Sequence, residues 1–145
     1  MALKADRNVV ETTGRFKAGS MAMAAGGVLS VDTAASGLNT TVSYATNPSG
    51  AKPIGVLLSP VANYDWDTDI KPLEKEVYAY ADQIPILVIG TVLTNMVTGS
   101  PSVGDTAYLA ASGYITPTQA TGAPEIGQFV SMADADSYYH IDIRC

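Results

Sequence analysis

Short runs of alternating apolar and polar residues, separated by turns rich in Gly, Pro, Asn and Ser, recur along most of this chain. Alternation with a period of two places successive side chains on opposite faces of an extended strand. The runs that predict strands are 40–45, 52–58, 76–80, 84–93, 125–131 and 138–143. Thirteen glycines and eight prolines, scattered throughout, leave little room for long helices. The pattern therefore predicts an all-β fold, built as a small β-barrel or a β-sandwich.

The segment 103–117 predicts a compact β-hairpin. Its first strand alternates apolar with other residues, and Ser112 and Gly113 provide the turn before the chain returns. We expect Ala107, Leu109 and Ile115 to pack inward or against a neighbour.

Three further patterns predict how strands are placed. The run 52–58 is apolar on both faces, which favours a central strand. Gly26 and Gly27 separate two short runs of small residues and predict a hairpin. The Ile-Gly pairs at 54–55 and 126–127 begin similar runs, which suggests two similarly placed strands.

Charge divides the chain into a basic start and an acidic body. The formal net charge is −6, but residues 1–17 carry +2 and the remainder carries −8. We therefore predict an extended N-terminal arm over 1–18 and a single β domain over 19–145. The arm either lies on an acidic neighbour or is a solvated, frayed terminus. The acidic balance argues against nucleic-acid binding, and no apolar run is long enough to predict a membrane span.

Candidate groups for catalysis are few. The chain has one histidine, His140, and one cysteine, Cys145, so no internal disulfide can form. On a regular strand, residues five apart face opposite sides and lie roughly 17 Å apart, so these two cannot form a catalytic dyad. The ligand spacing of a zinc site and the glycine loop of a phosphate site are also missing. The sequence therefore predicts neither an enzyme nor a cofactor.

The polar loop 63–69 is the stronger candidate for binding. Asp65, Asp67 and Asp69 would project to one side of an extended segment and repel one another unless a cation or a basic partner neutralises them. An EF-hand would need glycine at the sixth position, where this chain has isoleucine, so no metal ligand is assigned. Tyr64 and Trp66 stand beside these acids. A lone Trp in a polar loop either anchors an interface or folds back onto the core of its own domain. The loop therefore predicts a contact surface, with a cation site and a solvated loop as alternatives.

Three blocks of sequence, in this order, resemble the capsid decoration proteins of tailed bacteriophages, also called cement or head-stabilising proteins. The blocks are Met1-Ala-Leu-Lys-Ala-Asp-Arg-Asn8, the strand region 47–58 (Asn-Pro-Ser-Gly-Ala-Lys-Pro-Ile-Gly-Val-Leu-Leu), and the region 92–117, which ends with the predicted hairpin. The similarity of pattern covers most of the chain and is weakest over 60–80.

The resemblance implies a structural virion protein without enzyme activity. It would be made in the host cytoplasm, bind the major capsid protein on the outer surface of the phage head, and stabilise contacts between capsid subunits. The N-terminal arm would contact the capsid through Lys4, Arg7, Val9, Val10, Arg15 and Phe16. A symmetric homo-oligomer is implied, with a trimer favoured by family analogy and a dimer left open.

A second hypothesis comes from the residues alone. The chain could be a receptor-binding or glycan-binding β module that uses Trp66 and the neighbouring acids, with Ca²⁺ as a possible bound ion.

Overall fold

The structure is a computed structural model that describes residues 8–13, 16–19, 21–32, 41–62, 78–79 and 83–145. The elements in chain order are β1 (Asn8–Thr13), β2 (Lys17–Ala18), β3 (Val28–Val31), β4 (Thr41–Ser43), β5 (Pro53–Leu57), β6 (Val61–Ala62), β7 (Tyr78–Ala79), β8 (Ile86–Thr94), β9 (Thr106–Leu109), the 3-10 turn η1 (Ala111–Gly113), β10 (Ile115–Thr116), β11 (Glu125–Phe129) and β12 (Tyr139–Arg144). The all-β prediction is confirmed. Within these ranges no helix has the length and hydrophobicity needed to cross a membrane.

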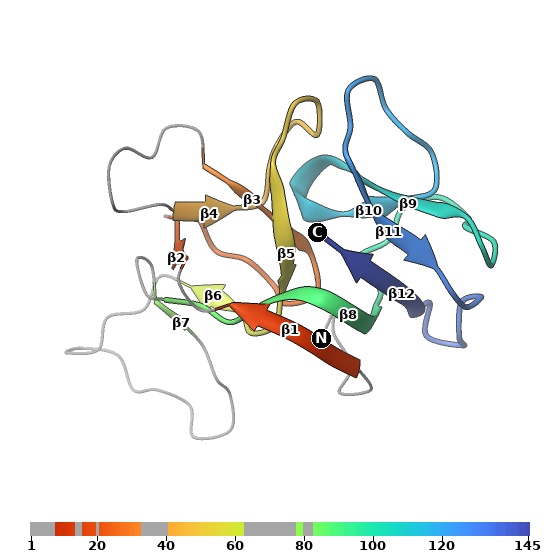
Figure 1. Ribbon diagram of the computed structural model, residues 1–145, viewed down its shortest axis with the longest axis horizontal. Coiled ribbons are helices and arrows are strands. Elements are labelled where there is room, and N and C mark those ends of the chain that lie inside the picture. Colours follow the sequence, from red (N-terminus) through yellow and green to blue (C-terminus); the bar gives the residue numbers. More distant parts are fainter. Residues whose placement is uncertain (1–7, 14–15, 20, 33–40, 63–77, 80–82) are drawn as a thin grey trace.

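One mixed sheet contains ten of the strands (Figure 1). Its order is β10-β9-β11-β12-β8-β5-β3-β4-β2, with β1 also paired to β8, while β6 and β7 form a separate parallel pair. Among the described residues the path ends at β10 and at β2, so the sheet is open.

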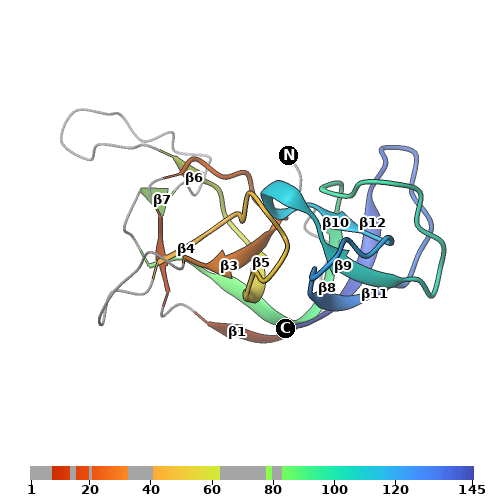
Figure 2. The same cartoon turned by 90° about the horizontal axis from the view of Figure 1, so that it is seen from above.

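The sheet branches at β8. Residues 86 and 87 pair with both β5 and β1, and residues 89–91 pair with both β12 and β1. A strand has only two edges, so β1 occupies one edge of β8, while β5 and β12 share the other (Figures 1 and 2). The branch divides the sheet into two sheet arms. One consists of β5-β3-β4-β2, and the other, called the C-terminal arm below, consists of β12-β11-β9-β10.

Strands β3, β5 and β8 separate two hydrophobic cores. Neighbouring residues on these strands point alternately to the two sides, as a pleated strand requires. The first core, which the C-terminal arm closes, contains Val28, Val56 and Leu87. The second core, which β2, β4 and β6 close, contains Leu29, Leu57 and Ile86. All six are fully buried, so the prediction of a central strand over 52–58 is confirmed.

The predicted hairpin is present as β9 and β10. Ile115 pairs with Leu109, and both pack in the first core with Ala107. Ser112 and Gly113 both have positive φ, 58° and 76°, and form the turn.

The hairpin turn is docked on Tyr44, a side chain that is only 6% exposed. A Cβ at Gly113 would lie 2.5 Å from the Tyr44 ring. Because glycine has no Cβ, the turn can pack closely against this ring. The Tyr44 hydroxyl accepts a hydrogen bond from the Gly27 amide (3.1 Å) and donates one to the Ala24 carbonyl. Tyr44 therefore ties the hairpin to the loop before β3.

The prediction of a hairpin at Gly26 and Gly27 is wrong. Gly26 does turn the chain, with φ of 103°, but the residues before it do not pair with β3. Met23 instead forms a bridge with Val61, and the Gly26 amide donates to the Leu57 carbonyl. The edges of β3 are already occupied by β4 and β5, so the preceding segment pairs elsewhere.

The two Ile-Gly pairs share a local backbone feature, although their strands lie in different places: β5 between β8 and β3, and β11 between β9 and β12. Gly55 and Gly127 each lie beside a register shift and each lets a neighbouring strand approach closely. A Cβ at Gly55 would lie 2.2 Å from the Leu87 carbonyl oxygen, and one at Gly127 would lie 1.8 Å from the Asp142 carbonyl oxygen. Any side chain at these positions would push two strands apart.

Part of the predicted N-terminal arm lies in the sheet. Residues 8–13 form β1 along β8, and residues 17–18 pair with β4. Phe16, between them, is half-buried and packs against the second core. The boundary at residue 18 stays a prediction.

Substitution of Gly127 by alanine should destabilise the protein by roughly 3 kcal/mol or more, because the new methyl group would overlap the backbone of β12. Gly19→Ala is the matched control, since its Cβ would meet no atom closer than 3.4 Å, and it should cost less than about 1 kcal/mol. Urea unfolding followed by circular dichroism measures both. Equal midpoints for the two variants would contradict this account of Gly127.

Tyr44→Phe should cost about 1–3 kcal/mol, because the buried Gly27 amide loses its acceptor. Burial also raises the pKa of Tyr44 above its ordinary value near 10. The folded state therefore keeps this proton while the unfolded state releases it, so the stabilisation is complete below about pH 10 and is lost as the pH rises further. The wild-type unfolding free energy should fall more steeply than that of Tyr44→Phe between about pH 10 and 11. If the unfolding free energies of the two proteins fell with pH at the same rate, the conclusion that burial raises the pKa of Tyr44 would be contradicted.

Candidate interaction surface

The outer face of the sheet β9-β11-β12-β8 presents polar side chains to solvent. One side of these strands packs on the first core, through residues such as Ala107, Ile141 and Ile143. Directly paired residues of antiparallel strands point to the same side, so the pairing register shows which side chains share the outer face.

A row of polar residues crosses this face from strand to strand. Thr106 pairs with Gln128, Gln128 pairs with Asp142, and Asp142 pairs with Thr91. Gln128 is exposed and the other three are half-buried. Only one of the four carries a charge, so the row offers hydrogen-bonding groups with little net charge.

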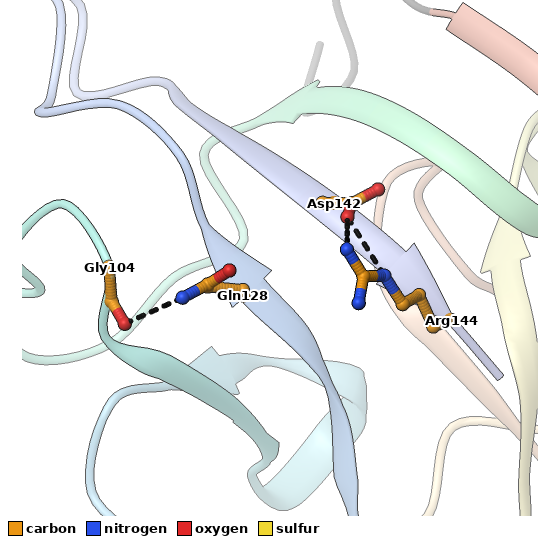
Figure 3. Close-up of polar contacts among 4 residues, drawn as sticks. All are labelled: Gly104, Gln128, Asp142 and Arg144. Carbon is orange, nitrogen blue, oxygen red and sulfur yellow. Dashed lines mark hydrogen bonds and ion pairs between the residues drawn. The ribbon is translucent and has the colours of Figure 1, made fainter.

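The hydrogen bonds on this face hold the row in place (Figure 3). The Gln128 side-chain amide donates to the Gly104 carbonyl at 2.9 Å, which joins β11 to the turn before β9. Arg144 donates to one carboxylate oxygen of Asp142 through both Nε (2.9 Å) and Nη2 (2.6 Å). This ion pair neutralises the charge in the row, and Arg144 remains 70% exposed.

A second row runs beside the first and reaches β1. Arg144 pairs with Ile89, and Ile89 pairs with Glu11. Arg144 and Glu11 are exposed and Ile89 is half-buried. The outer face therefore extends across β8 onto the strand contributed by the N-terminal segment.

A third row, toward the other end of the strands, is less polar. The Val130 amide donates to the His140 carbonyl (3.0 Å), and His140 pairs with Leu93. Val130 is exposed and His140 is half-buried. Cys145 follows five residues after His140, directly after the end of β12.

The N-terminal arm residues are only partly placed. Val9 and Val10 lie in β1, where Val9 pairs with Gly90. Phe16 packs on the second core. The remaining three, Lys4, Arg7 and Arg15, lie outside the described residues.

The loop predicted as a contact or cation site lies outside the described residues, with all of its candidates: Tyr64, Asp65, Trp66, Asp67 and Asp69. Its role stays a prediction. In the part of the chain that the structure describes, no three His, Cys, Asp or Glu side chains are grouped closely enough to hold a metal ion.

A small polar depression of about 230 Å³ opens beside β3 and β4. Ser30, Asp32, Ser43, Asn47 and Ser49 contribute to its lining. The Ser30 hydroxyl is buried and has no hydrogen-bond partner within the described ranges. Such a site can hold an ordered water or the hydroxyl group of a small ligand.

Sequence reasoning did not find the outer face. Its rows combine residues from β8, β9, β11 and β12, and only the register brings them together. The available signal was the period-two alternation in 138–143, which places His140 and Asp142 on one side of the last strand.

Comparison with known proteins adds no relative. No model of a protein family matches the chain, and a search of curated proteins finds no significant similarity.

Replacing Arg144 by alanine should change the free energy of unfolding by less than about 1 kcal/mol, because its ion pair with Asp142 is exposed to solvent. Asp142→Asn is the matched variant from the other partner of the pair and should have a similarly small effect. Chemical unfolding at low and high salt checks both. A loss of several kcal/mol from Arg144→Ala would show that this pair is a stabilising element of the fold instead of part of its surface.

Proposed function

We propose that this protein is a capsid decoration protein that binds the outer surface of a phage head and stabilises contacts between major capsid subunits. The observation that carries the proposal is the broad, nearly neutral outer face of the β9-β11-β12-β8 sheet, which continues onto β1. The resemblance of the three sequence blocks to capsid decoration proteins supports the same function.

A nearly neutral face suits this task. Burying charged groups at an interface requires their desolvation, which costs free energy unless each group is well paired. Thr91, Thr106 and Gln128 can exchange hydrogen bonds with water for hydrogen bonds with a partner at a smaller cost. On a symmetric shell many such modest contacts act together, so the total stabilisation exceeds that of any single contact.

The rigidity of the domain also supports the proposal. Two buried cores share the β3-β5-β8 wall, so the outer face is fixed before any partner binds. A preformed surface loses less conformational entropy on binding than a flexible one. The N-terminal segment enters the domain through β1, beside the same face, so arm and face can contact one partner together.

The test uses heads of the phage that encodes this chain, assembled without it. Addition of the recombinant protein should raise the temperature at which the heads break open, and electron cryo-microscopy should show added density on the outer shell. The control is Leu109→Asp, which places a charge in the first core and should unfold the domain. Heads that open at the same temperature with and without the wild-type protein would overturn the proposal.

A further inference from the structure

Three large apolar side chains are exposed at one end of the C-terminal arm. They are Val103, Val130 and Met132, which are 58%, 44% and 64% exposed. Single exposed apolar residues are ordinary, whereas a group of them in one place marks an interaction site.

A backbone hydrogen bond brings the chain at Val103 beside the chain at Val130. The Gly104 amide, next to Val103, donates to the Phe129 carbonyl, next to Val130, at 2.8 Å. Met132 follows two residues later, in the loop between β11 and β12. The loop before β9 and the loop before β12 lie at the same end of the molecule, on the right in Figures 1 and 2. We call Val103, Val130 and Met132 the end patch.

The turn that presents Val103 is held by its own side chains. The Ser102 amide donates to the Asp105 carboxylate (2.8 Å), and the Asp105 amide donates to the Ser102 carbonyl (3.1 Å). Gly104, with φ of 92°, supplies the left-handed residue that the turn requires. Val103 is thus fixed at the tip of the turn, where it has no core to enter.

The loop that presents Met132 is held in the same way. The Asp134 carboxylate accepts hydrogen bonds from the amides of Asp136 and Tyr138, both at 2.9 Å. The Ser131 hydroxyl donates to the Met132 carbonyl (3.0 Å) and accepts from the His140 amide (2.9 Å). The end patch is therefore preorganised, which lowers the entropy cost of binding.

The two segments that present the end patch carry charge of one sign. Residues 76–143 contain no lysine or arginine but contain seven acids. Three of these, Asp105, Asp134 and Asp136, lie in the two segments that present the patch. A second copy placed patch to patch would bring like charges together, whereas a basic partner would be attracted.

We infer that the end patch docks on a segment of the major capsid protein in which apolar side chains are flanked by lysine or arginine. This inference rests on the proposed function and names the part of the protein that meets the shell. The apolar centre provides the buried contact, and the acidic rim selects and orients the basic partner.

The experiment measures sedimentation of the protein with heads assembled without it. The patch variant combines Val103→Ser, Val130→Thr and Met132→Gln. The matched control combines Met21→Gln and Tyr114→Ser, two apolar residues that are 37% and 38% exposed outside the patch. All proteins are compared at about 50 mM and about 500 mM NaCl, because attraction to a basic partner weakens with salt.

We expect the patch variant to bind at least about tenfold more weakly than the wild type, the control to bind as the wild type does, and wild-type binding to weaken at high salt. Circular dichroism and thermal melting check that the variants fold. If the triple variant does not fold, Val103→Ser and Met132→Gln are measured singly, and each should weaken binding.

The outcomes separate this inference from the proposed function. If the patch variant binds as tightly as the wild type, the end patch is not the docking surface, although the proposed function stands. If salt leaves wild-type binding unchanged, the basic character of the partner is wrong. If the wild type does not sediment with the heads, both the proposed function and this inference are overturned.

Discussion

The rest of the structure depends on one wall of three strands, β3, β5 and β8, that is buried on both faces. Each fully buried aliphatic side chain on this wall contributes roughly 1.5–3 kcal/mol, and neighbouring residues contribute to different cores. Because a one-residue slip of a strand would exchange its two sets of side chains, the wall also fixes the register of everything paired to it. The branch at β8 then lets two sheet arms enclose separate cores around one shared layer.

Close backbone contacts shape the two arms around that wall. Gly55 and Gly127 let strands approach so closely that a Cβ would overlap a neighbouring carbonyl oxygen. The register shifts beside them bend the strands. As a result, the C-terminal arm closes the first core and leaves its other side as a broad, weakly charged face. The proposed function uses that face, and the inferred docking site lies at its end.

Local patterns predicted the hairpin at 103–117 well, because its alternation, its turn residues and its partners lie within fifteen residues. The same reasoning failed at Gly26 and Gly27. A Gly-Gly pair predicts that the chain turns, and it does, but it does not determine which strand the preceding residues join. Met23 pairs with Val61 because β4 and β5 already occupy both edges of β3. The candidate surface was missed for a related reason, since its rows join residues that are far apart in the chain.

The sequence by itself determined the all-β class, the central position of the run 52–58, the hairpin, and the presence of a single histidine and a single cysteine. These follow from periodicity, turn chemistry and residue inventory, which are local or additive properties. Only the tertiary structure decided that β8 branches, that Tyr44 ties the hairpin turn to the loop before β3, and that the turn carrying Val103 lies beside the chain at Val130. Strand order and side-chain contact between distant segments depend on competition among all possible pairings in the folded chain, and no short window of sequence records that competition.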